Sequence, residues 1–190
     1  MLPWEHLAVG YLLYSAWSHL REGQRPTGRL VVAVAVATQL PDLIDKPLAW
    51  EFGLLPGGQT LGHSIAFGLP AVAFVFGAFG RRSAVAFGIG YLSHLAGDVM
   101  YPVVLGGSPR VSFLLWPFVE SGGGESPGFL SETRDILGDA WQFMMSPEGT
   151  VYLTAELALL LAVFSLWLYD GRPGVPRRSR QVRIGRRGDS

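Results

Sequence analysis

Five apolar segments constrain the fold of this chain more than any other feature of its sequence. They cover residues 3–20, 30–40, 61–79, 84–105 and 150–169, and their mixture of Ala, Leu, Val, Phe and Gly predicts helices. A helix needs about 20 mostly apolar residues to cross a bilayer. The last three segments are long enough, the first is marginal, and the second reaches this length only by continuing through the PDLID sequence at 41–45. We therefore expect an all-α, integral membrane helical bundle with four or five transmembrane segments.

The composition agrees with a membrane protein. The chain is 49% hydrophobic and only 16% charged, whereas a soluble domain of 190 residues normally carries more charge on its surface. Its formal net charge is zero, so no overall field favours nucleic acid as a partner. Cysteine is absent, which excludes disulfides and thiolate metal sites and leaves His and carboxylate side chains as the available metal ligands.

The region between residues 106 and 147 is too polar to cross a membrane. Within it, residues 131–145 show helical periodicity, which predicts either a short helix on the membrane surface or an ordinary packed loop helix, with Ser131 as its N-cap. Ser146 followed by Pro147 is a strong start signal for the last helix. A tight break at 80–82 predicts a helical hairpin.

The arginines predict an orientation. They gather between residues 21 and 29, at 81–82, and between 172 and 187, and these places share one side if five segments alternate. Basic residues near membrane ends favour the cytoplasm, so we expect the N-terminus outside and the C-terminal tail cytoplasmic. This prediction makes residues 1–170 a membrane-embedded domain of a multi-pass cytoplasmic-membrane protein, and residues 171–190 a disordered Arg-rich tail.

Five ionisable side chains inside or beside the apolar segments fall on the outer face of this topology: His6, Asp42, His63, His94 and Asp98. Such groups are costly in a bilayer and therefore mark candidate functional sites. His94 and Asp98 are spaced i and i+4, which places both on one helix face. Two imidazoles and two carboxylates suit zinc or a similar divalent ion, and His6 is available for a second ion. Lys46 is the only cation near the carboxylates in the sequence, so they require bound protons or a bound metal.

Three further residues are expected beside the site. Glu156 lies at a depth similar to His94, where it either accepts the second ring N–H of a ligating His or pairs with another buried group. The role of Asp45 stays open. Ser64 follows His63, but no base is spaced to make it a nucleophile. His19 is interpreted as an ordinary interfacial residue.

Four motifs resemble a known family: His6 in an early helix, PD at 41–42, GHS at 62–64 and HLAGD at 94–98. The chain is similar over roughly residues 1–102 to the membrane-bound metal-dependent hydrolases, also described as LexA-binding, inner-membrane-associated hydrolases. This resemblance implies a reaction class and no particular substrate. The sequence departs from that family's usual PD-x-D by having PDLID.

A more distant similarity links the same order of residues to zinc-dependent phospholipase C and the S1/P1 nucleases. It implies that Asp42, His63, His94 and Asp98 bind one zinc ion and that His6 and Asp98 bind another. No His follows His94, so the third zinc of those enzymes has no match and a site with one or two ions is expected.

The sequence therefore predicts a metal-dependent hydrolase with Asp42, His94 and Asp98 as catalytic residues. It would use a divalent ion to activate water against a phosphoester or lipid-like ester, with membrane lipid and a small-molecule or lipid ester as partners and no nucleic acid. The alternative is a transporter or ion-binding scaffold in which the same residues line an ion path. A transporter would place these groups near the midplane, whereas here most lie near one end.

Overall fold

The structure, a computed structural model, describes residues 1–121 and 128–175. Its elements are α1 (Pro3–Trp17), η1 (Ser18–Glu22), α2 (Gly28–Lys46), η2 (Pro47–Glu51), α3 (Ile65–Phe79), α4 (Arg81–Val104), η3 (Ser112–Leu115), α5 (Phe129–Met144) and α6 (Pro147–Tyr169). Over these two ranges the chain forms helices and turns without any strand, which confirms the all-α prediction. The predicted Arg-rich tail lies outside the described residues from position 176 onward.

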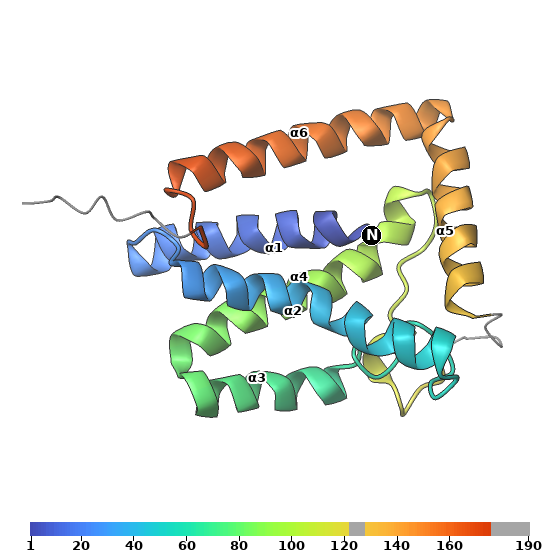
Figure 1. The fold of residues 1–190 in the computed structure, drawn as a ribbon, viewed down its shortest axis with the longest axis horizontal. Coiled ribbons are helices and arrows are strands. Elements are labelled where there is room, and N and C mark those ends of the chain that lie inside the picture. The colour runs from blue at the N-terminus through green and yellow to red at the C-terminus, as the bar shows by residue number, and fades with distance from the viewer. Residues whose placement is uncertain (122–127, 176–190) are drawn as a thin grey trace, which may run out of the picture.

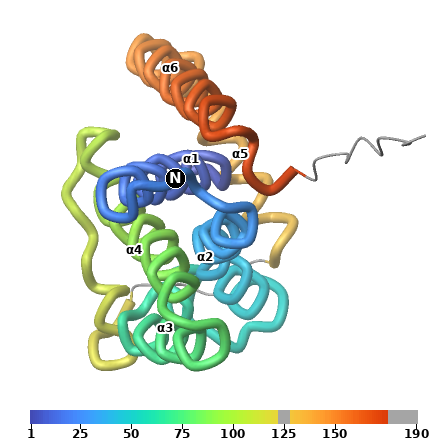
Figure 2. Tube along the Cα trace, turned by 90° about the vertical axis from the view of Figure 1, so that its left-hand side faces the viewer, coloured from blue at the N-terminus to red at the C-terminus, as the bar shows by residue number. Residues whose placement is uncertain are grey.

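Helices α2 and α4 pack against each other at the centre of the molecule, with α1 and α3 beside them (Figure 1). Helices α1, α3 and α6 run in one direction and α2 and α4 in the other, while α5 crosses one end. Figure 2 shows α6 on the outside, next to α1 and away from α3. Two groups of buried side chains fill the spaces between the central helices: Ala37, Phe87, Tyr91, Leu95 and Phe113 in one, and Tyr14, Leu30, Val34 and Ala86 in the other.

Small residues bring α2 and α4 unusually close. A Cβ atom on Gly90 would lie 2.7 Å from the Val34 carbonyl oxygen, so only glycine fits at this contact. Helix α2 also continues through Pro41 to Lys46, as the second apolar segment required if it was to reach the length of a span. This close approach sets the carboxyl-terminal half of α2 against the middle of α4, where the polar residues of both helices meet.

The helix boundaries follow local signals. Gly80, with a φ of 79°, separates α3 from α4 and forms the predicted tight hairpin. The Ser146 side chain accepts a hydrogen bond from the Gly149 N–H and is followed by Pro147, as predicted for the start of α6. The prediction that Ser131 caps the loop helix is wrong: α5 begins at Phe129, and the cap position belongs to Gly128, whose φ of 111° turns the chain into the helix.

Within the described residues, α6 is the one helix both long and apolar enough to cross a membrane by itself, with 23 residues and a mean hydropathy of 2.0. Helix α3 is apolar but has only 15 residues. Large apolar side chains of α6 point away from the rest of the molecule, among them Val151, Leu157, Leu161, Phe164 and Leu168. Such a face suits contact with lipid.

Candidate metal centre

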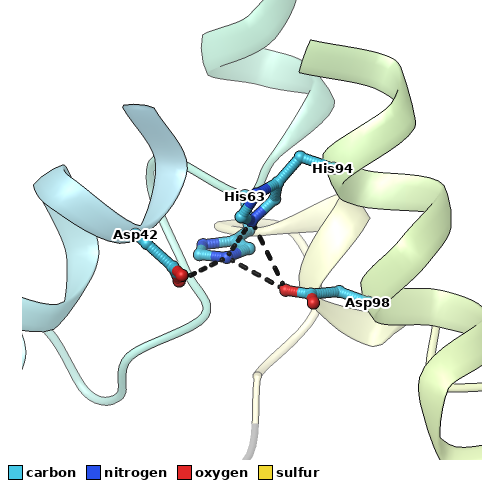
Figure 3. Close-up of side chains that lie close together, drawn as sticks. All are labelled: Asp42, His63, His94 and Asp98. Carbon is cyan, nitrogen blue, oxygen red and sulfur yellow. Dashed lines mark hydrogen bonds and ion pairs between the residues drawn. The ribbon is translucent and has the colours of Figure 1, made fainter. Parts of the chain in front are cut away.

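Four side chains from three parts of the chain point toward one another (Figure 3). Asp42 comes from α2, His63 from the loop before α3, and His94 and Asp98 from successive turns of α4. Each offers one nitrogen or oxygen atom, and these four atoms all lie within 4.8 Å of one another. Both imidazoles are fully buried, and the Asp42 side chain is 14% exposed. We call these four residues the metal centre.

Hydrogen bonds fix the protonation of both imidazoles. His94 Nδ1 lies 2.7 Å from the Thr38 carbonyl oxygen, which can only accept, so this nitrogen carries the proton. His63 Nδ1 lies 2.7 Å from Asp45 Oδ2 and donates to that carboxylate in the same way. In the neutral rings, the two Nε2 atoms therefore present lone pairs, and they face each other at 3.1 Å.

The carboxylates of the centre add more lone pairs to the same space. Asp42 Oδ1 lies 3.5 Å from His63 Nε2, and Asp98 Oδ2 lies 3.3 Å from the same atom and 3.5 Å from His94 Nε2. Four such atoms require a positive charge among them. Burial by itself would lower the pKa of His63, but hydrogen bonds with Asp42, Asp45 and Asp98 outweigh it and raise that pKa to about 10. The metal-free centre therefore holds a proton that a divalent ion would displace.

Asp45 is the residue that orients His63. Its carboxylate is fully buried and accepts the backbone N–H groups of Thr60 at 2.7 Å, Gly62 at 2.6 Å and His63 at 3.3 Å, besides the His63 ring. The role that the sequence left open for Asp45 is thus a partner of a candidate ligand, the position expected of a carboxylate behind a metal-bound His.

The GHS sequence supplies the backbone geometry for this contact. A Cβ atom on Gly62 would lie 2.9 Å from the Pro41 carbonyl oxygen, so the loop can reach α2 only with glycine there. The Tyr91 hydroxyl anchors the same loop by donating to the carbonyl oxygens of Gly62 at 2.7 Å and Ser64 at 2.9 Å. Ser64 caps α3 through the Phe67 N–H and makes no contact with the metal centre, so it positions the loop.

His6 lies directly against the metal centre. Its ring stacks on His94 with centroids 3.9 Å apart, and its Nε2 is 3.2 Å from Asp98 Oδ1, the oxygen that faces away from His63. The ring is 1% exposed, its Nδ1 makes no hydrogen bond, and the ion-pair contact with Asp98 is the polar contact of its Nε2 within the described residues. The terminal amine of Met1 is 3.4 Å from the same Asp98 oxygen. A buried ring nitrogen without a hydrogen bond is costly, and the position of His6 against Asp98 fits the second ion expected for these two residues.

Glu156 does not take the place expected for it. It accepts a hydrogen bond from the Trp4 indole N–H, whereas Asp45 and the Thr38 carbonyl hold the second ring nitrogens of the two histidines. The reason is the position of α6, which packs on α1 and α5 and does not reach the metal centre. The prediction that Glu156 supports a ligating His is therefore corrected, and its pairing with another group is the alternative that the structure favours.

A second polar cluster lies at the other end of α1. Asp170 accepts hydrogen bonds from Tyr11 at 2.6 Å and Ser15 at 2.7 Å and lies 2.7 Å from His19 Nε2. Burial by itself would raise the pKa of Asp170, but these three partners lower it. His19 is therefore more than the ordinary interfacial residue that its sequence position indicated. We call these four residues the Asp170 cluster.

Three residues near the metal centre could not be recognised from the sequence as part of a site: Thr38, Gln59 and Arg110. Thr38 acts through a backbone carbonyl, which any residue type provides. Gln59 donates to Asp98 Oδ2 at 2.8 Å and accepts a hydrogen bond from Arg110. A cavity of about 1370 Å³ opens beside the centre and is lined by Asp42, Lys46, Gln59, Asp98 and Arg110 among others. The candidate ligands thus adjoin a space large enough for a substrate.

The sequence model of the YdjM inner membrane protein family matches residues 1–173. This match covers both polar clusters and almost all of the described residues. No curated protein and no solved structure matches the chain. An inner membrane family agrees with the apolar composition and with the exposed apolar face of α6. The chain therefore belongs to the YdjM inner membrane protein family and is a membrane protein.

Proposed function

We propose that this protein is a membrane-bound metal-dependent hydrolase whose divalent ion, zinc or a similar metal, is held by Asp42, His63, His94 and Asp98. The observation that carries the proposal is the convergence of two imidazole nitrogens and two carboxylate oxygens, all within 4.8 Å of one another, on a space that requires a cation. Two nitrogens and two oxygens are a donor set that zinc accepts. His6 with Asp98 provides for a second ion, so the site takes one or two.

In this proposal, residues around the metal centre orient its ligands and accept a proton during hydrolysis. A bound divalent ion supplies Lewis-acid chemistry, by lowering the pKa of water and drawing charge from a phosphoryl or carbonyl oxygen. Asp45 and Thr38 hold His63 and His94 with their Nε2 lone pairs toward the centre. Asp42 and Asp98 line the cavity, so these carboxylates meet water and substrate and are the groups placed to accept a proton. Asp42, His94 and Asp98 are the catalytic residues of this proposal.

The proposed setting is a multi-pass bundle with its site near the outer surface. Helices α1 to α4 and α6 alternate in direction, which suits five crossings, and α5 lies across the end that holds the metal centre. Arg81 and Arg82 begin α4 at the opposite end, which the positive-inside rule assigns to the cytoplasm. The N-terminus is then outside and the tail cytoplasmic. A site at this depth suits a phosphoester or lipid-like ester presented from the membrane.

Metal analysis of the detergent-purified protein tests the proposal. We expect wild type to retain about one or two divalent ions and His94→Ala and Asp98→Ala to retain far less. Asp170→Asn is the matched control, because it alters a buried carboxylate that also contacts a His but lies outside the metal centre. Equal metal content in all four proteins would contradict the proposal. A reporter fused after Ser190 should read cytoplasmic, and an external signal would invert the topology.

A further inference from the structure

Two cationic side chains line the cavity beside the metal centre, and they differ in whether they form an ion pair. The Lys46 ammonium forms an ion pair with Asp42 Oδ2 at 2.7 Å and lies over the Trp50 ring. Arg110 also lines the cavity, yet within the described residues its guanidinium contacts only a neutral group, the side-chain oxygen of Gln59. The positive charge of Arg110 is therefore free to face a ligand.

Gln59 ties this free charge to the metal centre. Its side-chain oxygen accepts from Arg110, and its side-chain nitrogen donates to Asp98 Oδ2 at 2.8 Å. Its backbone oxygen accepts from Ser121 at 2.6 Å, which holds the residue in place. A single amide group thus separates the guanidinium from a candidate metal ligand. A group bound to Arg110 would lie next to the centre.

The balance of charge favours an anion at this position. A divalent ion would offset the charges of Asp42 and Asp98, and within residues 1–121 and 128–175 no carboxylate forms an ion pair with Arg110. The other acidic residues that line the cavity, Glu51 on η2 and Glu132 on α5, form no ion pair with Arg110 in the part of the chain that the structure describes. Guanidinium has five N–H donors in a planar fork, which matches two oxygens of a phosphoryl group.

We propose that Arg110 binds a phosphoryl oxygen of the substrate, so that the metal centre acts on anionic phosphoesters and not on neutral carboxylic esters. This inference rests on the proposed hydrolase function and narrows its substrate class. The phosphoryl group belongs either to a lipid head group or to a soluble phosphoester, because both present the same oxygens to the guanidinium.

Calorimetric titration of the zinc-loaded protein with inorganic phosphate tests the inference. We expect Arg110→Gln to weaken phosphate binding by about 10- to 100-fold, since charge-assisted hydrogen bonds are lost, and Arg110→Lys to keep part of the affinity through its charge. Arg134→Gln is the control, because Arg134 is an exposed arginine on α5 that does not line the cavity. Gln59→Ala should weaken phosphate binding only about threefold, since it removes a hydrogen bond to Arg110 and leaves the charge.

Zinc content measured on the same samples distinguishes a failure of the proposed hydrolase function from a failure of the inference about Arg110. Wild type that takes up neither zinc nor another divalent ion would end the hydrolase proposal and this inference with it. Zinc-loaded wild type that does not bind phosphate, or Arg110→Gln that binds it as well as wild type does, would overturn the inference alone. The inference would also be overturned if Gln59→Ala lost as much phosphate affinity as Arg110→Gln does. Arg110 would then contribute only by holding Gln59 in place.

Competition against phosphate identifies the source of the phosphoryl group. Dioctanoyl phosphatidic acid in detergent and glycerol 3-phosphate in water carry the same phosphomonoester. Stronger competition by the lipid would support the inference with a lipid substrate, and equal competition would support it with a soluble one. Failure of both to displace phosphate would contradict it.

Discussion

The metal centre and the Asp170 cluster both bury a carboxylate against histidine, and both use residues of α1 or its neighbours, yet their hydrogen bonding differs. In the Asp170 cluster, the hydroxyl groups of Tyr11 and Ser15 donate to Asp170, and His19 lies at hydrogen-bond distance from it. Each contact there can pair a donor with an acceptor. In the metal centre, His63 and His94 use their Nδ1–H groups elsewhere, so their Nε2 atoms, 3.1 Å apart, can be paired only by an additional proton or a metal ion.

This difference shows why burial of His and Asp is a weak criterion for a metal site. The Asp170 cluster has its hydrogen bonds satisfied as it stands, and its contacts join α1 and η1 to the end of α6. The metal centre is satisfied only with a cation, either a proton on His63 or a metal ion. Counting donors and acceptors therefore separates a structural cluster from a candidate catalytic one, and the following predictions test that separation.

The largest expected effect is the loss of zinc from the metal centre. A four-ligand zinc site is worth about 10–16 kcal/mol, so removing one ligand with Asp98→Ala should weaken zinc binding about a hundred- to a thousandfold. Zinc at the same concentration should raise the apparent Tm of wild type and Asp170→Asn in detergent clearly more than that of Asp98→Ala. A similar zinc-dependent rise in Tm in all three proteins would mean that Asp98 is not needed for zinc binding, and would contradict the separation of the two clusters.

The reverse experiment removes the acceptor of the Asp170 cluster. Asp170→Ala leaves Tyr11, Ser15 and His19 without their shared partner, which should cost about 3 kcal/mol of unfolding free energy. For a chain of this length that loss lowers the apparent Tm by about 6–12 °C. Zinc affinity, measured by competition with a chelating dye, should stay within about threefold of wild type. A large loss of zinc affinity would show that the two clusters are coupled through α1.

A smaller effect is expected at Asp45, which orients a candidate ligand without binding the ion. Asp45→Asn keeps the size of the side chain but removes the charge that receives the His63 ring N–H and three backbone N–H groups. Loss of such a partner weakens metal binding about 10- to 100-fold. Dye competition measures this change, and an unchanged Kd would mean that His63 needs no carboxylate behind it.

The two clusters should also differ in their response to pH. Because the carboxylates raise the pKa of His63 to about 10, the metal-free centre binds a proton at neutral pH that zinc must displace. Zinc affinity should therefore rise about tenfold per pH unit between pH 6 and 8 and level off only near pH 10. The Asp170 cluster should respond in a different pH range, because the pKa of Asp170 is lowered. Its contribution to the stability of the folded protein is complete above the ordinary pKa of a carboxyl group and is lost only as the solution becomes strongly acidic.

The contrast between the clusters also explains what the sequence could predict. Spacing and apolar context located Asp42, His63, His94 and Asp98, because ionisable groups are rare in such segments. The same reasoning treated His19 as isolated, since Asp170 lies just beyond the last apolar segment and gives no hint of its partners. It also assigned Glu156 to the histidines from helix depth alone. The position of a residue along its helix predicts how deep its side chain lies in the bundle. It does not predict which neighbouring helix that side chain contacts.

The fold shows a similar limit. Apolar segments and start signals located the helices, including the hairpin at Gly80 and the beginning of α6 at Pro147. The sequence could not show that α6 packs on α1 and α5 and avoids the metal centre, because its apolar residues surround the whole helix. The Arg110 side chain was missed for a related reason: its segment has no periodicity, so only the folded chain shows that it reaches the cavity.

Thr38 gives the smallest expected effect and the sharpest test of how the histidines are held. Its backbone carbonyl accepts from His94, while its side-chain hydroxyl donates to the Ala35 carbonyl oxygen at 2.9 Å. Thr38→Val keeps the shape of this fully buried residue and removes only the hydroxyl, so the contact with His94 survives. We expect zinc affinity to change less than about threefold, against the 10- to 100-fold loss in Asp45→Asn. A loss as large as that of Asp45→Asn would mean that the hydroxyl fixes the position of α2 against α4, and that the backbone acceptor alone does not orient His94.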